Sequence, residues 1–347
     1  MASVQNRAET ENDVVLELRD VSVSFDGGNS KVLDGVDFDV RRGETVGIVG
    51  ESGSGKSMFA SSMLNAVEEP GRVTGEVTYH PQDGDPVIVT DLSESQLKKD
   101  LRWTDLTFVV QSAQSAFNPT MSIRDHFLET FNAHGHDKRE GIRKAREIME
   151  DLYLNPDQVL TSFPHQLSGG MKQRTLIALA VVLDPEVLIM DEPTAALDLL
   201  MQRAIISLLA EIKEKYDLTM VFVTHDLNLI SVIADRLGVM YAFEFVEIAP
   251  TKDLLTNPSH PYTRMLLNSV PNISAPVDAM SGIDGQAPNP KEVPDGCRFH
   301  TRCPIADEEC FTVPPAIEPL EEEHTAACFY EERSRSNIPL HINSEYQ

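Results

Sequence analysis

Eight consecutive residues, GESGSGKS, have the types and the spacing that bind a nucleotide phosphate. Lys56 can reach the β- and γ-phosphate oxygens, the Ser57 hydroxyl can ligate Mg²⁺, and the glycines let backbone N–H groups close around the α- and β-phosphates. The pattern G-x-x-x-x-G-K-[ST] is complete in Gly50, Glu51, Ser52, Gly53, Ser54, Gly55, Lys56 and Ser57. An apolar run (45–49) precedes it and a helix-compatible stretch (58–67) follows. This order predicts that the chain binds a nucleotide such as ATP together with Mg²⁺.

A pair of acidic residues, Asp191 and Glu192, ends the apolar run VLIM. Open α/β sheets place their ligand chemistry at the carboxyl ends of strands. We expect Asp191 to hold Mg²⁺, directly or through water, and Glu192 to polarise a water for in-line attack on the γ-phosphate. His225 and Gln111 end two further apolar runs. His225 is expected to contact the γ-phosphate, and the Gln111 amide to reach Mg²⁺ or the attacking water.

A second glycine-containing stretch, Ser168, Gly169 and Gly170, precedes an apolar helix pattern. Backbone N–H groups at the start of a helix attract anions, yet this stretch lies in a helical section, away from the phosphate loop (residues 50–57). We therefore expect it to serve the nucleotide of another subunit. Phe25, at the end of a strand pattern, is expected to stack on adenine, with a core aromatic on the strand face as the alternative.

The only four cysteines of the chain, Cys297, Cys303, Cys310 and Cys328, lie together in a Pro-rich segment. We expect a cytosolic protein, as argued below, and stable disulfides are rare in the cytosol. Four thiolates suit either an iron–sulfur cluster or a structural zinc ion. The spacing C-x₅-C-x₆-C-x₁₇-C lacks the C-x₂-C pairs usual in zinc ribbons, which favours a cluster over zinc. Unligated thiols are the third alternative.

The elements that must position these residues alternate between strand and helix patterns, which predicts an α/β core. Strands are predicted at 14–25, 36–40, 45–50, 106–111, 187–192 and 219–225. Helices are predicted at 91–102, 122–134, 138–154, 168–183, 199–216 and 226–235. We interpret the mostly helical section 112–180 as a subdomain inserted into a nucleotide-binding domain at 14–250. A disordered lead (1–13), a small domain with the four cysteines (251–333) and a tail (334–347) complete the predicted organisation.

Composition limits the classes of partner. Fifty-five acidic and 29 basic residues give a formal net charge of −26 over 347 residues, which argues strongly against nucleic acid or anionic lipid as the main partner. The acidic excess is spread along the chain, which indicates a salt-loving source. No apolar run approaches the roughly 18 residues of a transmembrane helix, and the polar N-terminus lacks the apolar region of a signal peptide. We expect the protein to stay in the cytosol and to need a partner for any work at a membrane.

Taken in order, GESGSGKS, Gln111, LSGGM, LIMDEP, ALD (196–198) and His225 resemble the motifs of the nucleotide-binding subunit of ABC transporters. The resemblance implies a P-loop NTPase that hydrolyses ATP and dimerises head to tail. Each ATP would then lie between the phosphate loop of one subunit and the signature motif of the other. Mapped by motif, Ser168 and Gly170 would complete the partner's site, and Asp198 would lie at the dimer seam.

Three further stretches, FPHQLSGGMKQR, NPSHPYT (257–263) and GCRFHTRCP, resemble the ATPase subunits of oligopeptide/dipeptide-type importers. The resemblance covers about 14–329 and favours a [4Fe–4S] cluster on the cysteines. It implies a location at the cytoplasmic face of the membrane and several partners: a second ATPase subunit, in a heterodimer or a homodimer, two transmembrane permease subunits and, indirectly, an extracellular solute-binding protein. Ser112, Phe243 and LLMQ (199–202) depart from the family pattern, so the solute stays open among peptides, sugars and nickel.

Two other functions compete with that of an importer subunit. The first is a soluble ABC ATPase of an assembly or repair machine, but repair members need a long coiled coil, and the sequence has no sustained heptad pattern of that length. The second is a scaffold that binds nucleotide without turnover. The presence of Lys56, Asp191 and Glu192 argues against a scaffold.

Overall fold

The structure, a computed structural model, describes residues 14–111, 116–195, 197–269, 282–321 and 323–340. The predicted lead (1–13), residues 341–347 of the predicted tail, Ser112 and Ala196 lie outside the described residues. The chain forms two compact units that interleave along the sequence. The first unit takes the described residues within 1–16, 39–44 and 78–223, and the second takes those within 17–38, 45–77 and 224–347.

The first unit contains three parallel strands in the order β6-β7-β8. They are β6 (Leu106–Val109), β7 (Val187–Asp191) and β8 (Thr219–Val223). Every residue of β7 and β8 is buried, which is typical of parallel strands covered on both faces. The register pairs Val109 with Met190, and Asp191 with Val223. The carboxyl ends of the three strands therefore lie level at one edge.

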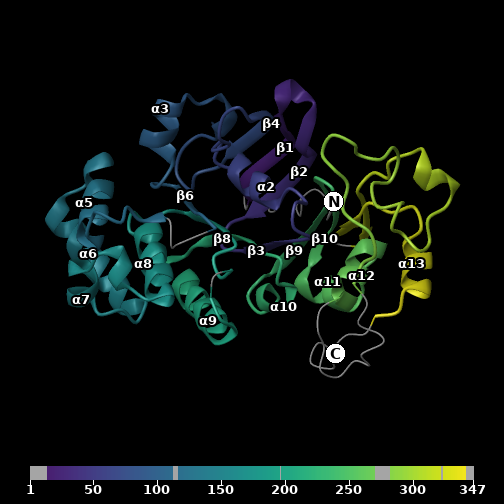
Figure 1. Cartoon of the computed structure of the whole chain (residues 1–347). Helices are drawn as coiled ribbons and strands as arrows, with labels where there is room; N and C mark the ends of the chain where they lie inside the picture. Colours follow the sequence, from purple (N-terminus) through teal and green to yellow (C-terminus); the bar gives the residue numbers. More distant parts are fainter. Residues whose placement is uncertain (1–13, 112–115, 196, 270–281, 322, 341–347) are drawn as a thin grey trace, which may run out of the picture. The chain divides into compact units, whose positions relative to one another are not determined.

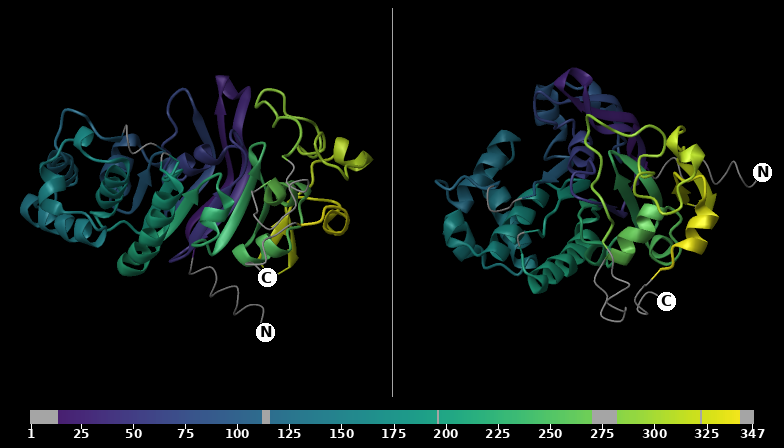
Figure 2. Two further views of the ribbon diagram at one scale, coloured as in Figure 1. Left: turned by 60° about the horizontal axis from the view of Figure 1, so that its bottom comes forward. Right: turned by 45° about the vertical axis from the view of Figure 1, so that its right-hand side comes forward.

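The first unit also contains five helices (Figure 1). They are α5 (Ile123–Ala133), α6 (Lys138–Asp151), α7 (Pro156–Thr161), α8 (Gly169–Val181) and α9 (Leu199–Tyr216). The first three pack against one another, α6 also packs on α8, and α8 packs on β6; Figure 2 shows this group in teal from two further sides. Each of the five begins after a side chain that accepts a hydrogen bond from the first helical turn. These capping residues are Ser122, Asp137, Asn155, Ser168 and Asp198.

Shorter elements complete the first unit. They are β5 (Val87–Ile88), η2 (Val89–Asp91), α3 (Glu94–Gln96), η3 (Leu97–Leu101) and η4 (Pro164–Gln166).

The second unit contains a sheet in which the strand before the phosphate loop and two strands near the end of the chain both take part. Its strand order is β3-β9-β10-β12-β11, with β3 (Thr45–Val49), β9 (Arg236–Tyr241), β10 (Glu244–Pro250), β12 (His324–Ala326) and β11 (Glu318–Glu321). Strand β3 runs parallel to β9, and the remaining pairs are antiparallel. Three strands that lie mainly in this unit follow the order β2-β1-β4: β2 (Ser30–Arg41), β1 (Val14–Phe25) and β4 (Arg72–Tyr79).

The helices of the second unit are short. They are η1 (Asp26–Gly28), α2 (Lys56–Ser62), α10 (Leu227–Ile230), α11 (Thr251–Thr256), α12 (Pro261–Ser269), η6 (Glu308–Phe311) and α13 (Glu331–Asn337). A buried ring cluster anchors α2, because Phe59 lies 5.4 Å from the Phe38 ring and 5.0 Å from the Phe245 ring, centroid to centroid. Arg264 of α12, 5% exposed, donates to the carbonyl oxygens of Pro258 (2.8 Å) and Ile338 (2.6 Å). The C-terminal helices are thereby tied to the body of the unit.

The predicted α/β core is confirmed, but two predicted helices are wrong in length. In place of a helix at 91–102, Ser93 forms a capping box with Gln96 and starts a helix only at residue 94, which widens into η3 after three residues. In place of a helix at 226–235, α10 spans only four residues. Asp235 cannot belong to this helix, because its N–H donates to the Thr45 carbonyl oxygen at 2.8 Å and its carboxylate accepts from the Thr45 N–H at 2.7 Å. Six strands within the described ranges were not predicted: β4, β5, β9, β10, β11 and β12.

Candidate functional site

The phosphate loop leaves β3 and enters α2 within the second unit. Gly50 (φ +153°) and Gly55 (φ +106°) have backbone angles that favour glycine. A Cβ at Gly50 would lie 2.2 Å from the carbonyl oxygen of Met240, and one at Gly55 would lie 2.7 Å from that of Val32. Glycine is therefore required at both places, because the loop runs against the backbone of two neighbouring strands.

Polar groups of the loop turn inward. Lys56, 5% exposed, donates from Nζ to the carbonyl oxygens of Gly50 (2.9 Å) and Glu51 (2.8 Å). The Ser54 hydroxyl is buried and has no hydrogen-bond partner among the described residues. A cradle with a buried amine and a buried hydroxyl fits the phosphates of a nucleotide, because such groups otherwise remain costly to bury.

Asp191, Glu192 and Gln111 lie together at the carboxyl edge of the β6-β7-β8 sheet in the first unit. Asp191 ends β7 and is 6% exposed. Glu192 has a positive φ of +45°, and its N–H donates to the carbonyl oxygen of Val223 at 2.8 Å. The Gln111 Nε2 group donates to Glu192 Oε2 over a long 3.4 Å. A carboxylate and an amide placed side by side can accept from and donate to one water.

His225 and Phe25 belong to the second unit. His225 is exposed, two residues beyond the end of β8, and Asp226 beside it caps α10 by accepting from the Leu229 N–H at 3.0 Å. Phe25 is half-buried, and a Cβ at Gly71 would lie 2.8 Å from its ring. The contacts of His225 with the γ-phosphate and of Phe25 with adenine stay predictions.

The second glycine stretch starts α8. Ser168 is exposed, and its hydroxyl accepts from the Met171 N–H at 3.3 Å. Gly169 is half-buried and Gly170 is buried, with a Cβ at Gly170 placed 2.2 Å from the end of the Met201 side chain. The stretch thus opens a helix of 13 residues, as expected of an anion site at a helix start.

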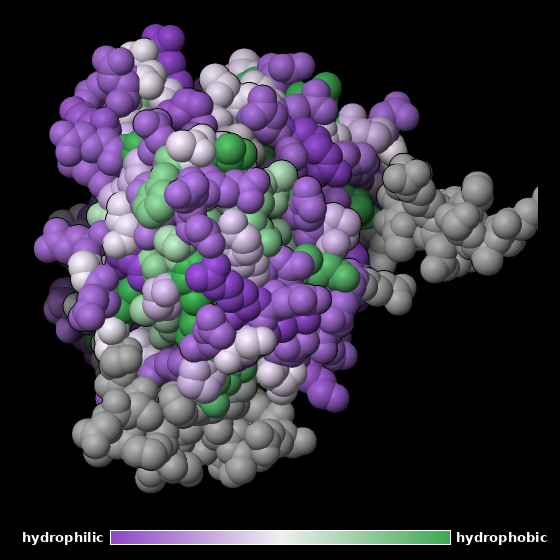
Figure 3. All heavy atoms as spheres, turned by 90° about the vertical axis from the view of Figure 1, so that its right-hand side faces the viewer, coloured by the Kyte–Doolittle hydropathy of each residue, from purple (hydrophilic) through white to green (hydrophobic). Residues whose placement is uncertain are grey.

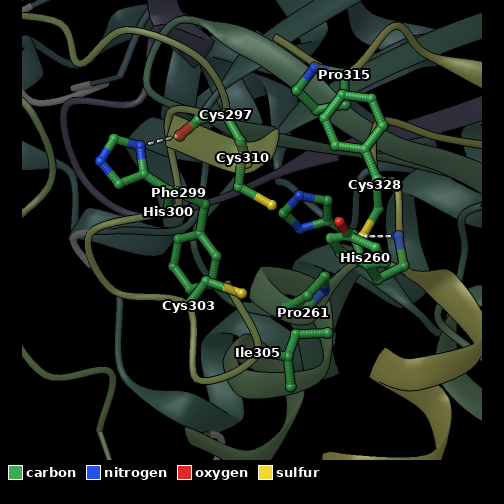
Figure 4. Close-up of a pocket in the computed structure, with 12 residues that line it drawn as sticks. His260, Pro261, Cys297, Phe299, His300, Cys303, Ile305, Cys310, Pro315 and Cys328 are labelled. Atoms are coloured by element: carbon green, nitrogen blue, oxygen red, sulfur yellow. Dashed lines mark hydrogen bonds between the residues drawn. The ribbon is translucent and has the colours of Figure 1, made fainter. Parts of the chain in front are cut away.

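All four cysteines line one small pocket of the second unit, together with His260 (Figure 4). They are Cys297, Cys303, Cys310 and Cys328, and none forms a disulfide. The cavity measures about 10 Å³, enough for about one water or ion. Within the described ranges, no group of three or more His, Cys, Asp or Glu side chains is arranged to hold a metal ion. The cysteines as they lie therefore do not form a metal site, and the cluster stays a prediction.

Burial shapes the chemistry of these thiols. Burial, helped by the neighbouring cysteines, raises the pKa of Cys297 to about 11 and that of Cys328 to about 12. Burial also raises the pKa of Cys303. Without a metal these groups are protonated, so a metal that binds here must release protons.

Sequence reasoning missed two residues that hold the phosphate loop, Tyr262 and Arg302. Arg302 forms a bidentate ion pair with Glu51, at 2.8 and 3.0 Å. The Glu51 N–H donates to the Tyr262 hydroxyl at 2.8 Å. Both partners occur in stretches that mark the resemblance, NPSHPYT and GCRFHTRCP, but no chemical pattern in the sequence links those stretches to the loop.

Comparisons with known proteins assign the family. The model of the ABC transporter family matches residues 33–195, and that of the oligopeptide/dipeptide transporter C-terminal region matches residues 246–310. The dipeptide transport ATP-binding protein DppD of Caldanaerobacter subterraneus subsp. tengcongensis is 43% identical over 88% of this chain and 93% of its own length. The oligopeptide transport ATP-binding protein OppD of Escherichia coli is 34% identical over 93% of this chain and 95% of its own length.

Solved structures agree with this assignment. A dimeric ATP-binding cassette, MJ0796, in a post-hydrolysis state bound to ADP and Pi, superimposes with a TM-score of 0.58 and 26% identity. The match covers 68% of this chain and 98% of that one. Among the helices of the described ranges, none is long and apolar enough to cross a membrane. The relatives named above are transport subunits, so an assembly or repair ATPase is not favoured. The chain therefore belongs to the ABC transporter family, as an ATPase subunit with the C-terminal region of the oligopeptide/dipeptide transporters.

Proposed function

We propose that this chain is one of two ATPase subunits that drive an importer of peptides. The 43% identity to a dipeptide transport ATP-binding protein, over 88% of this chain, carries the proposal. Peptides are the first choice of solute, and sugars and nickel are the alternatives. Two transmembrane permease subunits, a second ATPase subunit in a heterodimer and an extracellular solute-binding protein complete the assembly. The chain then works at the cytoplasmic face of the membrane.

We assign the roles of the site residues as follows. Bound ATP with Mg²⁺ supplies the γ-phosphate whose hydrolysis drives transport. The phosphate loop binds the phosphates through its backbone N–H groups and Lys56, whose amine moves from the loop carbonyls to the phosphate oxygens. Glu192 accepts a proton from the attacking water, which Gln111 orients. Metal-ligand roles are assigned to Ser57, Gln111 and Asp191.

The remaining site residues act around the nucleotide. His225 contacts the γ-phosphate and Phe25 stacks on the base. Ser168, Gly169 and Gly170 bind the nucleotide of the partner subunit. A nucleotide-binding domain at 14–250, with its helical subdomain at 112–180, would carry these residues, and the domain at 251–333 would carry the cysteines.

The cysteines are proposed to hold one metal centre, a [4Fe–4S] cluster, with zinc as the alternative. Four thiols on the wall of one pocket support the proposal. Four thiolates suit either centre.

The importer proposal is tested by purifying the tagged chain from detergent-solubilised membranes of its own cells. Two polytopic membrane proteins and a second ATPase should co-purify, and the ATPase rate of the complex with its binding protein should rise with peptides. A rate that rises with sugars or with nickel, and not with peptides, would show that the imported solute is a sugar or nickel. Recovery of the chain without any membrane protein would overturn the importer and favour an assembly ATPase.

The metal proposal is tested by anaerobic purification and elemental analysis. The protein should be brown, with about four irons per chain, and Cys303→Ser should lose the colour. Arg143→Gln, a control change at an exposed ion pair with Glu147 in α6, should keep it. Colourless protein with one zinc per chain would replace the cluster by zinc. Colourless protein with no metal and four titratable thiols would reject both.

A further inference from the structure

The side chain of Glu51, inside the phosphate loop, is fixed by an arginine far along the chain. Arg302 is 5% exposed at its side chain and donates to both carboxylate oxygens, at 2.8 and 3.0 Å. Its other N–H groups donate to the carbonyl oxygens of Asp284 (2.8 Å) and Ile283 (3.0 Å). A planar guanidinium held at four points is a rigid support, so the carboxylate it binds has little freedom to move.

The backbone of Glu51 is also held in place, by a tyrosine. The Glu51 N–H donates to the Tyr262 hydroxyl at 2.8 Å. The Tyr262 ring packs 4.6 Å from the Tyr241 ring and 5.4 Å from the Phe299 ring, centroid to centroid. All three rings are at most 1% exposed. The start of the phosphate loop therefore rests on a buried aromatic cluster.

The later part of the loop is held through the β9–β10 turn. The Phe243 N–H donates to the Ser54 carbonyl oxygen at 3.0 Å. Ala242 and Phe243 have positive φ values of +46° and +77°, which are strained for residues other than glycine. Arg298 donates to the Ala242 carbonyl oxygen at 2.5 Å and pairs with Glu244 at 3.1 Å. Arg298 thus holds the turn in the shape that the loop needs.

Three of these supports come from one short segment, the cysteine loop (residues 297–303), which supplies Arg298, Phe299 and Arg302. The cysteines at its two ends, Cys297 and Cys303, line the four-cysteine pocket (Figure 4). We propose that the cysteine loop is a positioning element of the nucleotide site. A change at the four cysteines, such as loss of a bound metal or the substitution Cys303→Ser, should then change the affinity for nucleotide. The inference rests on the proposed role of the phosphate loop.

Arg302 acts through Glu51 and not on the nucleotide itself. Without the guanidinium, the loop can visit shapes in which its N–H groups no longer converge, and binding must restore order at a free-energy cost. The expected result is weaker binding of ATP and ADP alike. A purely structural role would instead lower stability and leave the nucleotide affinity of the folded protein unchanged.

The first experiment measures the Kd of a fluorescent ATP analogue for the full chain. Arg302→Gln should raise the Kd by about tenfold, and Arg143→Gln, whose exposed ion pair with Glu147 joins two residues of α6, should leave it unchanged. Lys56→Ala serves as the reference for loss of phosphate binding. If Lys56→Ala weakens binding and Arg302→Gln does not, the nucleotide site stands and the inference is overturned. If neither matters, the phosphate-loop assignment itself fails.

The second experiment tests the connection by double-mutant cycles. Arg302→Gln and Glu51→Gln should not add in their effects on the Kd, because both break one pair. Cys303→Ser should raise the Kd in the parent protein and have little further effect in Arg302→Gln. Full additivity would contradict the connection. If Arg302→Gln does not fold, Arg302→Lys, which keeps the charge but loses the bidentate pairing with Glu51, should raise the Kd in its place.

Discussion

At the residue scale, Glu192 is notable for its backbone. A φ of +45° costs a non-glycine residue about 1–3 kcal/mol. The strained shape is held from the neighbouring strand, because the Glu192 N–H donates to the Val223 carbonyl oxygen at 2.8 Å. It also turns the carboxylate toward Gln111. Backbone strain of this kind tends to occur where a side chain must be aimed, which agrees with the role of general base proposed for Glu192.

The substitution Glu192→Gln should keep ATP binding and lose steady-state hydrolysis. The amide preserves the shape of the side chain but cannot take the proton of the attacking water, so the rate should fall by about 10²–10⁴-fold. Phosphate release and nucleotide Kd, measured on the same sample, check this. The control is Glu211→Gln, which changes an exposed glutamate of α9 bonded to the Tyr153 hydroxyl. A Glu192→Gln rate equal to that of the parent protein would show that Glu192 is not the base.

At the scale of elements, two helix starts carry motif residues and caps at once. Ser168 caps α8 and Asp198 caps α9, each by accepting from a backbone N–H three residues ahead. Between these starts, a Cβ at Gly169 would lie 3.7 Å from the Leu197 side chain, which is ordinary van der Waals contact. Near Asp198, two large apolar side chains are exposed, Leu199 (58%) and Leu200 (78%). Exposed leucines beside a helix start that is proposed to bind an anion suit a surface that another subunit covers.

A mixing experiment should show that Ser168 acts in the partner's site. A Lys56→Ala chain and a Ser168→Arg chain should each be inactive alone, because every site of either dimer carries a lesion. In a mixed dimer both lesions fall in one site and the other site is intact. ATPase activity should therefore return on mixing.

The mixing experiment depends on the native dimer, so the parent chain is first assayed alone. If it is active, the two variants are mixed directly. If it is active only with its partner ATPase, two arrangements are compared: both lesions in this chain, which damage both sites, and Lys56→Ala in this chain with the corresponding serine lesion in the partner, which damage one site. The second arrangement should be more active than the first. No gain of activity in the appropriate arrangement would contradict the role of Ser168 in trans.

At the scale of the whole molecule, the sequence predicted those features that depend on residues close together in the chain and missed those that depend on distant residues. The phosphate loop and the acidic strand end could be found because each is a short run whose chemistry is local. The Arg302–Glu51 pair could not, since its partners are separated by 251 positions and neither charge is unusual alone. Helix α10 was predicted too long for a related reason, because Asp235 is held by the distant Thr45 N–H. Contacts that decide local shape from afar leave no periodic pattern.

The net charge of −26 is a property that only the whole chain has. One face of the molecule, shown in Figure 3, carries mainly hydrophilic side chains with apolar ones scattered among them. We propose that this acidic composition suits high salt. Like charges repel one another in the compact state, and the repulsion reaches about 30 Å in 0.01 M salt but only about 3 Å in 1 M salt.

The midpoint of thermal unfolding should therefore rise as KCl is increased from about 0.01 M to about 1 M, because screening removes the self-repulsion. Sucrose of equal osmolality separates screening from a general solute effect. The matched variant changes four exposed acidic residues to their amides, bringing the formal charge from −26 to −22: Glu68, Glu69, Asp83 and Asp85. Its midpoint should start higher in low salt and rise less with KCl. A midpoint that does not respond to KCl, or that rises as much in sucrose, would contradict the proposal that the acidic composition suits high salt.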